Sequence, residues 1–400
     1  MLSRRLGWAL SLWVSALGCL YGLSARAPLV LEPARGQPSF ARPLATEGLG
    51  PPGYSAQAAR LGRSRSVGPA SAASVMRYEV GAPITAAAGV DETGVFVGAH
   101  DGVVHGLDHR LQLRYRRPLG GAIRGGVVGL PGGRLAVGTD RGLLHVLGSD
   151  GSSSLEYAAG APIDTAVALD RGLLVAAGRE VRALDDSGEV RWSFQARGKV
   201  FTTPAIGPSA FDPLGAIYVA AQDHTLYALD HRGVERWRVE VDRDIDGGPM
   251  VLPDGRVIVG DDGGKLRCFF PGGEPSWVQD VGGHVRAPLA LGAGDTVLVN
   301  VHGPRARLIG LDPTDGGLRW EYRFGPADDP SVGSRSGPRV DRDGNVYVGS
   351  HDNRLHAVDA GGNPRFVFAT GGDIDASPVL GPDGTLYFGS RDGVFYAIRR

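Results

Sequence analysis

The chain has 400 residues, including 63 Gly and 27 Pro; 42% of its residues are hydrophobic and only 7% are aromatic. This composition favours many short strands joined by tight turns over long helices. With 42 basic and 43 acidic residues the formal charge is −1, which argues against an electrostatic field that would draw the protein to nucleic acid or to an anionic membrane surface. We therefore expect no nucleic-acid partner.

The first 27 residues contain the parts of a secretory signal peptide in their usual order. Arg4 and Arg5 precede a mostly apolar run at 6–23, and Ala25-Arg26-Ala27 provides the small residues of a cleavage site. Cleavage after Ala27 predicts an exported protein, periplasmic or secreted.

Two alternatives to simple cleavage stay open. Residues 16–19, Ala-Leu-Gly-Cys, are similar to a bacterial lipobox, which would make Cys19 a lipidation site and the protein an outer-membrane lipoprotein. The apolar run is also barely long enough to serve as an uncleaved membrane anchor. In either case the N-terminal lipid or anchor would provide the contact with a membrane.

Residues 28–73 are rich in Pro, Gly, Ala, Ser and Arg and show no periodic pattern. Their apolar density is too low to offset the entropy cost of ordering. We expect a disordered linker.

From residue 74 onward a short β-rich string recurs about every 40 residues, as in VFVGAHDG at 95 and VYVGSHDN at 346. A period near 40 without helical periodicity is typical of one four-stranded propeller blade per repeat. The central positions of the eight strings are Val97, Val137, Val175, Val219, Val259, Val299, Val348 and Phe388.

The eighth repeat ends at residue 400 before its fourth strand, which would leave an exposed sheet edge. Residues 76–80, MRYEV, are similar to the fourth strands of other repeats, for example RWRVEV at 236. The sequence thus predicts an all-β fold: an eight-bladed β-propeller of four-stranded blades over 74–400, whose last blade is completed by an N-terminal strand. One closed ring predicts a monomer.

In several repeats the fourth strand begins at an aromatic residue. Before that residue, Ala or Gly, then Asp, then Gly recur at similar spacing. Gly310, Asp312, Gly316 and Trp320 give the longest version of this pattern. A large flat side chain suits the contact between adjacent blades, so we assign it a structural docking role. The docking aromatics are Trp192, Trp237, Trp277, Trp320 and Phe366.

These repeats resemble the tryptophan-docking motif A-x-D-x-x-x-G-x-x-x-W of the pyrroloquinoline-quinone-like propeller family over about 327 residues. Together with the signal peptide, the eight repeats and the length, they also resemble the lipoprotein family of the outer-membrane β-barrel assembly machinery. That resemblance implies a non-catalytic scaffold whose partners are proteins, including outer-membrane assembly components.

The enzyme alternative is a dehydrogenase that uses pyrroloquinoline quinone (PQQ) bound over Ca²⁺. The chain has no adjacent cysteines, no long insertions between strands and no evident Glu, Asn and Asp set for calcium. We therefore expect no cofactor, no metal site and no catalytic residues.

A third hypothesis is a ligand-binding or sensory propeller. Polar residues at the start of each first strand are predicted to face the ring axis: Thr85, Arg124, Asp164, Thr202, Asp246, Arg286, Arg335 and Asp375, with Ser334 as the alternative to Arg335. They would form either a polar pocket for a small zwitterion, sugar or peptide, or a set of mutually neutralising ion pairs.

Overall fold

A computed structural model describes residues 61–303, 305–325 and 333–400, all within the compact unit Arg42–Arg400. The signal peptide, the alternative lipidation site Cys19 and most of the predicted linker lie outside these ranges. Within them, no helix has the length and apolar character required to cross a bilayer.

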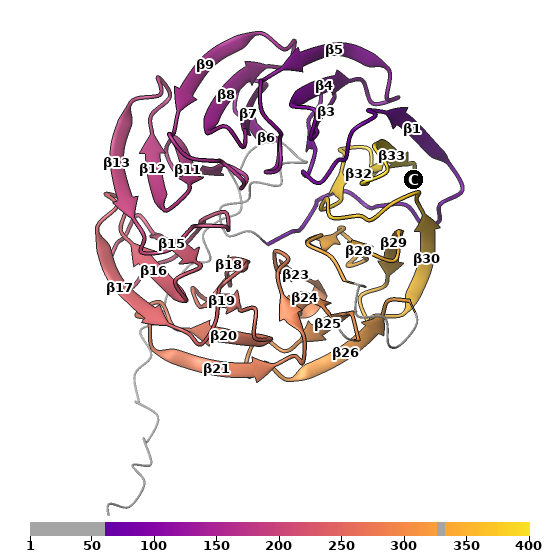
Figure 1. Cartoon of the computed structure of the whole chain (residues 1–400). Helices are drawn as coiled ribbons and strands as arrows, with labels where there is room; N and C mark the ends of the chain where they lie inside the picture. Colours follow the sequence, from indigo (N-terminus) through magenta and orange to yellow (C-terminus); the bar gives the residue numbers. More distant parts are fainter. Residues whose placement is uncertain (1–60, 304, 326–332) are drawn as a thin grey trace, which may run out of the picture. The chain divides into compact units, whose positions relative to one another are not determined.

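The described residues form eight antiparallel sheets that follow one another around a ring (Figure 1). Blades 1 to 4 each contain four consecutive strands. Their bounds are β2 Gly89–Val90, β3 Val95–Gly98, β4 Val103–Leu107 and β5 Leu113–Pro118; β6 Val128–Leu130, β7 Arg134–Gly138, β8 Leu143–Gly148 and β9 Ser153–Ala158; β10 Ala168–Leu169, β11 Leu173–Ala177, β12 Glu180–Leu184 and β13 Val190–Gln195; β14 Ala205–Gly207, β15 Ala216–Ala221, β16 Thr225–Leu229 and β17 Glu235–Glu240.

Blades 5 to 8 follow the same plan, except that the first strand of blade 6 is split in two and is followed by a short 3₁₀ turn, η1. Their bounds are β18 Gly247–Val251, β19 Val257–Gly260, β20 Lys265–Phe269 and β21 Pro275–Asp280; β22 His284–Val285, β23 Ala290–Leu291, η1 Ala293–Asp295, β24 Val297–His302, β25 Arg307–Leu311 and β26 Leu318–Arg323; β27 Arg339–Val340, β28 Val346–Ser350, β29 Arg354–Val358 and β30 Pro364–Ala369; β31 Val379–Leu380, β32 Leu386–Gly389 and β33 Val394–Ile398.

The sheet of blade 8 combines the two ends of the ring. Its strand order is β1-β33-β32-β31, and β1 (Val75–Glu79) pairs antiparallel with β33, with Val75 opposite Ile398 and Glu79 opposite Val394. The strand expected at 76–80 thus falls on β1. Backbone groups of the last strand that would otherwise form an open edge are paired by a segment from the start of the ring.

The burial pattern of each blade explains why the repeats need one another. The second and third strands, such as β15 and β16, are buried along their whole length, whereas the fourth strand β17 alternates between half-buried and exposed residues. The inner strands therefore have two apolar faces, and each face is covered by a neighbouring blade.

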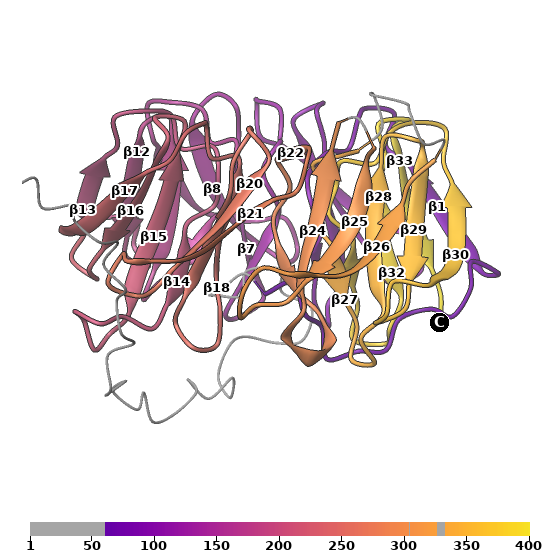
Figure 2. The same cartoon turned by 90° about the horizontal axis from the view of Figure 1, so that it is seen from below.

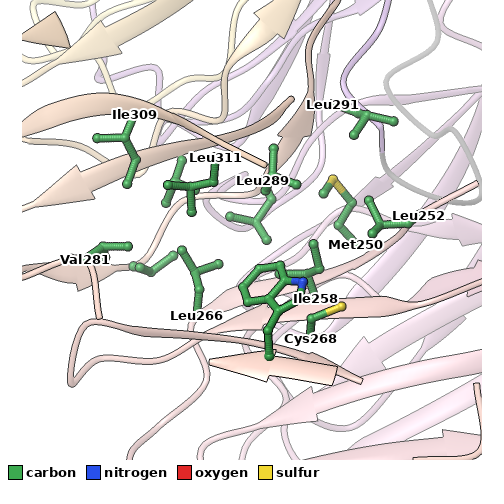
Figure 3. Close-up of a cluster of buried hydrophobic side chains, with 14 of the residues drawn as sticks. Met250, Leu252, Ile258, Leu266, Cys268, Val281, Leu289, Leu291, Ile309 and Leu311 are labelled. Atoms are coloured by element: carbon green, nitrogen blue, oxygen red, sulfur yellow. The ribbon is translucent and has the colours of Figure 1, made fainter. Parts of the chain in front are cut away.

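Eight clusters of buried side chains lie within the described residues, and each bridges two adjacent blades. One of them joins blades 5 and 6 and contains Met250, Leu266 and Cys268 from one side and Leu289 and Ile309 from the other (Figure 3). Another joins blade 8 to blade 1. The core is thus a closed ring of interfaces. Within it the fully buried Cys268 has its thiol pKa raised to about 12 by burial, as expected for an inert interior thiol.

The docking aromatics connect each blade to the next turn along the ring. The indole N–H of Trp237 donates to the carbonyl oxygen of Pro271 at 2.9 Å, and that of Trp277 donates to the carbonyl oxygen of Pro313 at the same distance. Gly273, at φ +96°, lies directly under the Trp237 ring, where a Cβ would approach it to 3.0 Å. A glycine is therefore required there both for the backbone conformation and for the contact.

The structure also explains why the docking pattern begins with a small residue. It lies opposite the aromatic residue in the third and fourth strands of the same blade: Ala228 opposite Trp237, Gly310 opposite Trp320 and Ala357 opposite Phe366. Blades 1 and 2 use Tyr115, over Gly151, and Leu155, over Gly188, in place of Trp. Blades 1 and 2 thus keep the contact without a Trp.

Residues 61–73 differ from the predicted disordered linker, which extended to residue 73. The segment 61–69 pairs with the ends of first strands: Val340 N–H donates to the Gly62 oxygen at 2.9 Å, and Ser64 N–H donates to the Val340 oxygen at 2.8 Å. Gly68 N–H donates to the Asp341 carboxylate, and the Tyr347 hydroxyl donates to the Pro69 carbonyl oxygen. Backbone bonding, which needs no apolar density, orders this part of the chain.

Replacing residues 74–81 with a Gly/Ser sequence of equal length should open blade 8. The loss of β1 pairing and of the contacts of Val75, Met76 and Tyr78 with two apolar clusters should lower the melting temperature by about 10 °C or more. Thermal unfolding followed by circular dichroism measures this change. An unaltered melting temperature would show that β1 does not close the ring.

Two matched substitutions separate hydrogen bonding from packing at the blade contacts. The indole N–H of Trp277 has an acceptor, whereas that of Trp320 is buried without a partner among the described residues. Both Trp→Phe changes remove similar volume, so Trp277→Phe should cost about 1 kcal/mol more than Trp320→Phe in urea unfolding. Equal costs would contradict the assigned role of the hydrogen bond.

Candidate functional site

A cavity of about 440 Å³ lies on the ring axis. All eight residues predicted to face the axis line it: Thr85, Arg124, Asp164, Thr202, Asp246, Arg286, Arg335 and Asp375. The structure therefore brings together the whole predicted set, one residue from each blade. We call the face where the first strands start the upper face and the opposite one the lower face, as drawn in Figure 2.

Small side chains explain why the axis is open. Two positions after each axial residue, or one position after Thr202 in blade 4, the chain carries Ala, Gly, Pro, Ser or Thr, and all of these residues line the cavity: Ala87, Gly126, Ala166, Thr203, Gly248, Pro288, Gly337 and Ser377. Because side chains alternate along a strand, these residues project from the same face as the axial ones.

The strand register corrects one predicted position. In blade 5 the axial residue is Asp246, and the residue four positions later, Met250, pairs with Ile258, which directly precedes the central Val259 of the second strand. The same relation holds in six other blades. In blade 4 the corresponding pair is Ala205 with Tyr218, which makes Phe201 the equivalent axial residue. Thr202 also lines the cavity, and its hydroxyl donates to the Ala220 oxygen at 3.3 Å.

Phe201 brings an aromatic ring into an otherwise charged part of the axis. The ammonium of Lys199 lies 4.5 Å from the ring centroid and the guanidinium of Arg335 lies 5.4 Å from it. Both contacts have cation–π geometry. A one-residue difference between the repeat connections hid this residue from sequence alignment.

Asp375 is the most strongly bound carboxylate of the axial set. It is buried and accepts from His351 Nε2 at 2.7 Å and from Arg391 at 2.6 Å. Burial alone would raise the pKa of this carboxyl, but the hydrogen bond and charge of His351 and the charge of Arg391 outweigh it and hold the pKa well below its usual range.

Three other axial charges are also paired, mostly with residues on the upper hairpins. Arg286 forms a two-pronged pair with Asp262, and Arg124 lies 3.6 Å from Asp140. Asp164 accepts from Lys199 at 2.9 Å. Most of the upper ring is thus neutralised within the protein.

His100 lines the cavity beside the axial residue Thr85. Its Nε2 lies 2.9 Å from the Thr85 hydroxyl, and burial together with the charges of Arg124 and Arg391 lowers its pKa. The imidazole is therefore neutral at pH 7.

The axial residues do not fit a calcium-bound quinone. Calcium needs several converging oxygen ligands, and no group of three or more potential metal ligands occurs among the described residues. Asp164 and Asp375 are bound to cationic groups, and Asp246 accepts from the Gln222 amide at 3.2 Å.

Sequence reasoning missed two further charged residues in the cavity, Arg391 and Arg339. Arg339 lies on β27, four positions after Arg335, at the lower end of the axis. An alignment of the repeats reveals it, because the equivalent positions in the other blades are all uncharged.

A family model described as outer membrane protein assembly factor BamB matches residues 71–230 and 222–400. The chain belongs to this family. The BamB of Nitrosomonas eutropha is 33% identical over 148 residues, covering 36% of this chain and 34% of that protein. The serine/threonine-protein kinase AfsK of Streptomyces griseus is 31% identical over 218 residues, covering 50% of this chain and 24% of the kinase. The matches thus span about a quarter to a third of these two relatives.

Solved structures share the architecture. BamB from Moraxella catarrhalis matches with a TM-score of 0.65 at 19% identity, over 82% of this chain and 98% of that one. The quinohemoprotein alcohol dehydrogenase of Comamonas testosteroni matches with a TM-score of 0.71 at 14% identity, over 87% of this chain and 80% of that one. At these identities the likeness establishes the propeller fold alone.

Asp375→Asn should lower the free energy of unfolding at pH 7 by about 1.5–3 kcal/mol, because it weakens charged hydrogen bonds. Since the folded carboxyl has a depressed pKa, its stabilisation is complete above the unfolded value of about 4 and is lost as pH falls below it. The difference in the free energy of unfolding between wild type and variant should therefore become smaller at acidic pH.

Urea unfolding at pH 7, 5 and 3 measures this gap, with Asp186→Asn, at an exposed turn, as the control. A gap at pH 3 as large as that at pH 7 would contradict the assigned ionisation.

Proposed function

We propose that the protein is an exported, non-catalytic scaffold that binds protein partners during outer-membrane protein assembly. The observation that carries this proposal is the match of the BamB family model across the whole ring, residues 71–400. The signal-like N-terminus supports a periplasmic location, with or without lipidation at Cys19.

The architecture suits such a role. A ring of eight interlocked blades presents hairpins and blade connections on two broad faces while its core stays rigid. Loops held by a rigid frame can bind a partner without a large entropy cost of ordering. Most of the charged residues on the axis, by contrast, are paired with other residues of the ring.

Affinity capture from native envelopes tests the scaffold role. The full chain, tagged after Arg400, should recover components of the β-barrel assembly machinery after mild cross-linking. The matched control is Arg339→Met, which alters the axial cavity and leaves the hairpins unchanged, and it should recover the same proteins. If the intact ring recovers no assembly components, the proposal fails.

A second candidate function, a ligand-binding propeller, is favoured by the convergence of all eight predicted polar residues on one cavity. It is compatible with the scaffold role, because the cavity and the loops occupy different parts of the ring. A PQQ-dependent dehydrogenase is the least supported candidate, since the axial carboxylates are bound to cations and an amide. Titration with Ca²⁺ should give no saturable binding.

A further inference from the structure

Arg339 is a buried cation without an anionic partner in the part of the chain that the structure describes. It lies on β27, lines the axial cavity and is only 6% exposed. Its Nε donates to the Pro378 carbonyl oxygen at 3.1 Å. Among the described residues the terminal nitrogens of this guanidinium make no hydrogen bond, and no carboxylate lies within ion-pair distance.

The fold does not require an arginine at this place. The residues at the equivalent register positions in the other seven blades are Gly89, Val128, Ala168, Ala205, Met250, Ala290 and Val379. Blade 5 accommodates a methionine of similar length there. Arg339 is therefore a local departure from the repeat, and packing alone gives no reason for it.

The charge on Arg339 persists at neutral pH. Burial lowers the pKa of the guanidinium to about 10, which still leaves it protonated at pH 7. Burying a charge without a counter-charge is unfavourable. The cavity arginines Arg124, Arg286 and Arg391 each have an aspartate nearby. Arg335 has no carboxylate within ion-pair distance among the described residues, but it is exposed and lies over the Phe201 ring. Arg339 is thus the buried cavity arginine that lacks a counter-charge among the described residues.

The surroundings of Arg339 are suited to one anionic group attached to an apolar body. Leu289, Pro338 and Pro378 line the cavity beside it. The Ser377 hydroxyl oxygen accepts from Gly337 N–H at 2.8 Å, which leaves its own hydrogen able to donate. Gly62 of the N-terminal segment also lines the cavity, and its backbone passes close to Pro338.

We propose that the axial cavity binds a small organic carboxylate, whose carboxylate group is held by the guanidinium of Arg339. Arginine presents two parallel N–H donors that match the geometry of a carboxylate. The ligand supplies the counter-charge that the chain lacks at this point, and its apolar part packs against the prolines. This inference rests on the second candidate function and assigns it a ligand class.

Calorimetric titration of the full chain at low ionic strength tests the proposal, with benzoate as the probe. Benzamide has the same ring without the charge, and inorganic phosphate has the charge without the ring. We expect benzoate to bind at least tenfold more tightly than either. Arg339→Met should weaken benzoate binding at least tenfold, whereas Arg342→Met, on an exposed arginine three residues further on, should not.

Thermal unfolding of Arg339→Met verifies that the ring remains folded, since Met250 already occupies the same place in blade 5. Benzoate binding that survives in Arg339→Met, or preferential binding of phosphate or benzamide, would overturn the assignment. Loss of binding in Asp246→Ala but not in Arg339→Met would support a ligand site at the upper ring and refute the role of Arg339. Absence of binding by every probe would contradict both the ligand class and the second candidate function.

Discussion

Burial of the two apolar faces of every blade is the constraint on which the rest of the structure depends. A single four-stranded blade cannot cover its own inner strands, so each sheet needs a neighbour on both sides. The eight clusters that bridge adjacent blades satisfy this need only when the ring is closed, because blade 8 must cover blade 1 as blade 5 covers blade 6. Closure is therefore a requirement of the core, and β1 completes the sheet at the junction of the two chain ends.

The same constraint produces the axial site. Interlocked blades fix eight first strands around one axis, so the residue at the start of each strand can vary without disturbing the core. Arg124, Asp164, Arg286 and Asp375 use this freedom to form charge pairs with neighbouring turns. Arg339 lies deeper, at a register position where the other blades carry uncharged residues, and no carboxylate among the described residues lies within ion-pair distance of it.

The repeat period, the docking aromatics and the convergence of the axial residues could be predicted from sequence, because each depends on a residue type that recurs at fixed spacing. Phe201 could not, since the connection into blade 4 differs by one residue and only the strand register reveals the shift. The order of residues 61–69 was also hidden, because backbone hydrogen bonds to Val340 and Arg342 leave no side-chain pattern. Arg339 was visible as a departure from the repeat, but its lack of a partner is a property of three-dimensional packing.

The path of the N-terminal segment determines how tension would enter the ring. Any pull transmitted from the N-terminal side of residue 61 reaches the bond between Leu61 and Leu291 of blade 6, and then the bonds of Gly62 and Ser64 to Val340, before it reaches β1. The contacts of Gly68 and Pro69 with Asp341 and Tyr347 lie next along the chain. The bonds of segment 61–69 to blades 6 and 7 would therefore bear such a load before the pairing of β1 with β33 does.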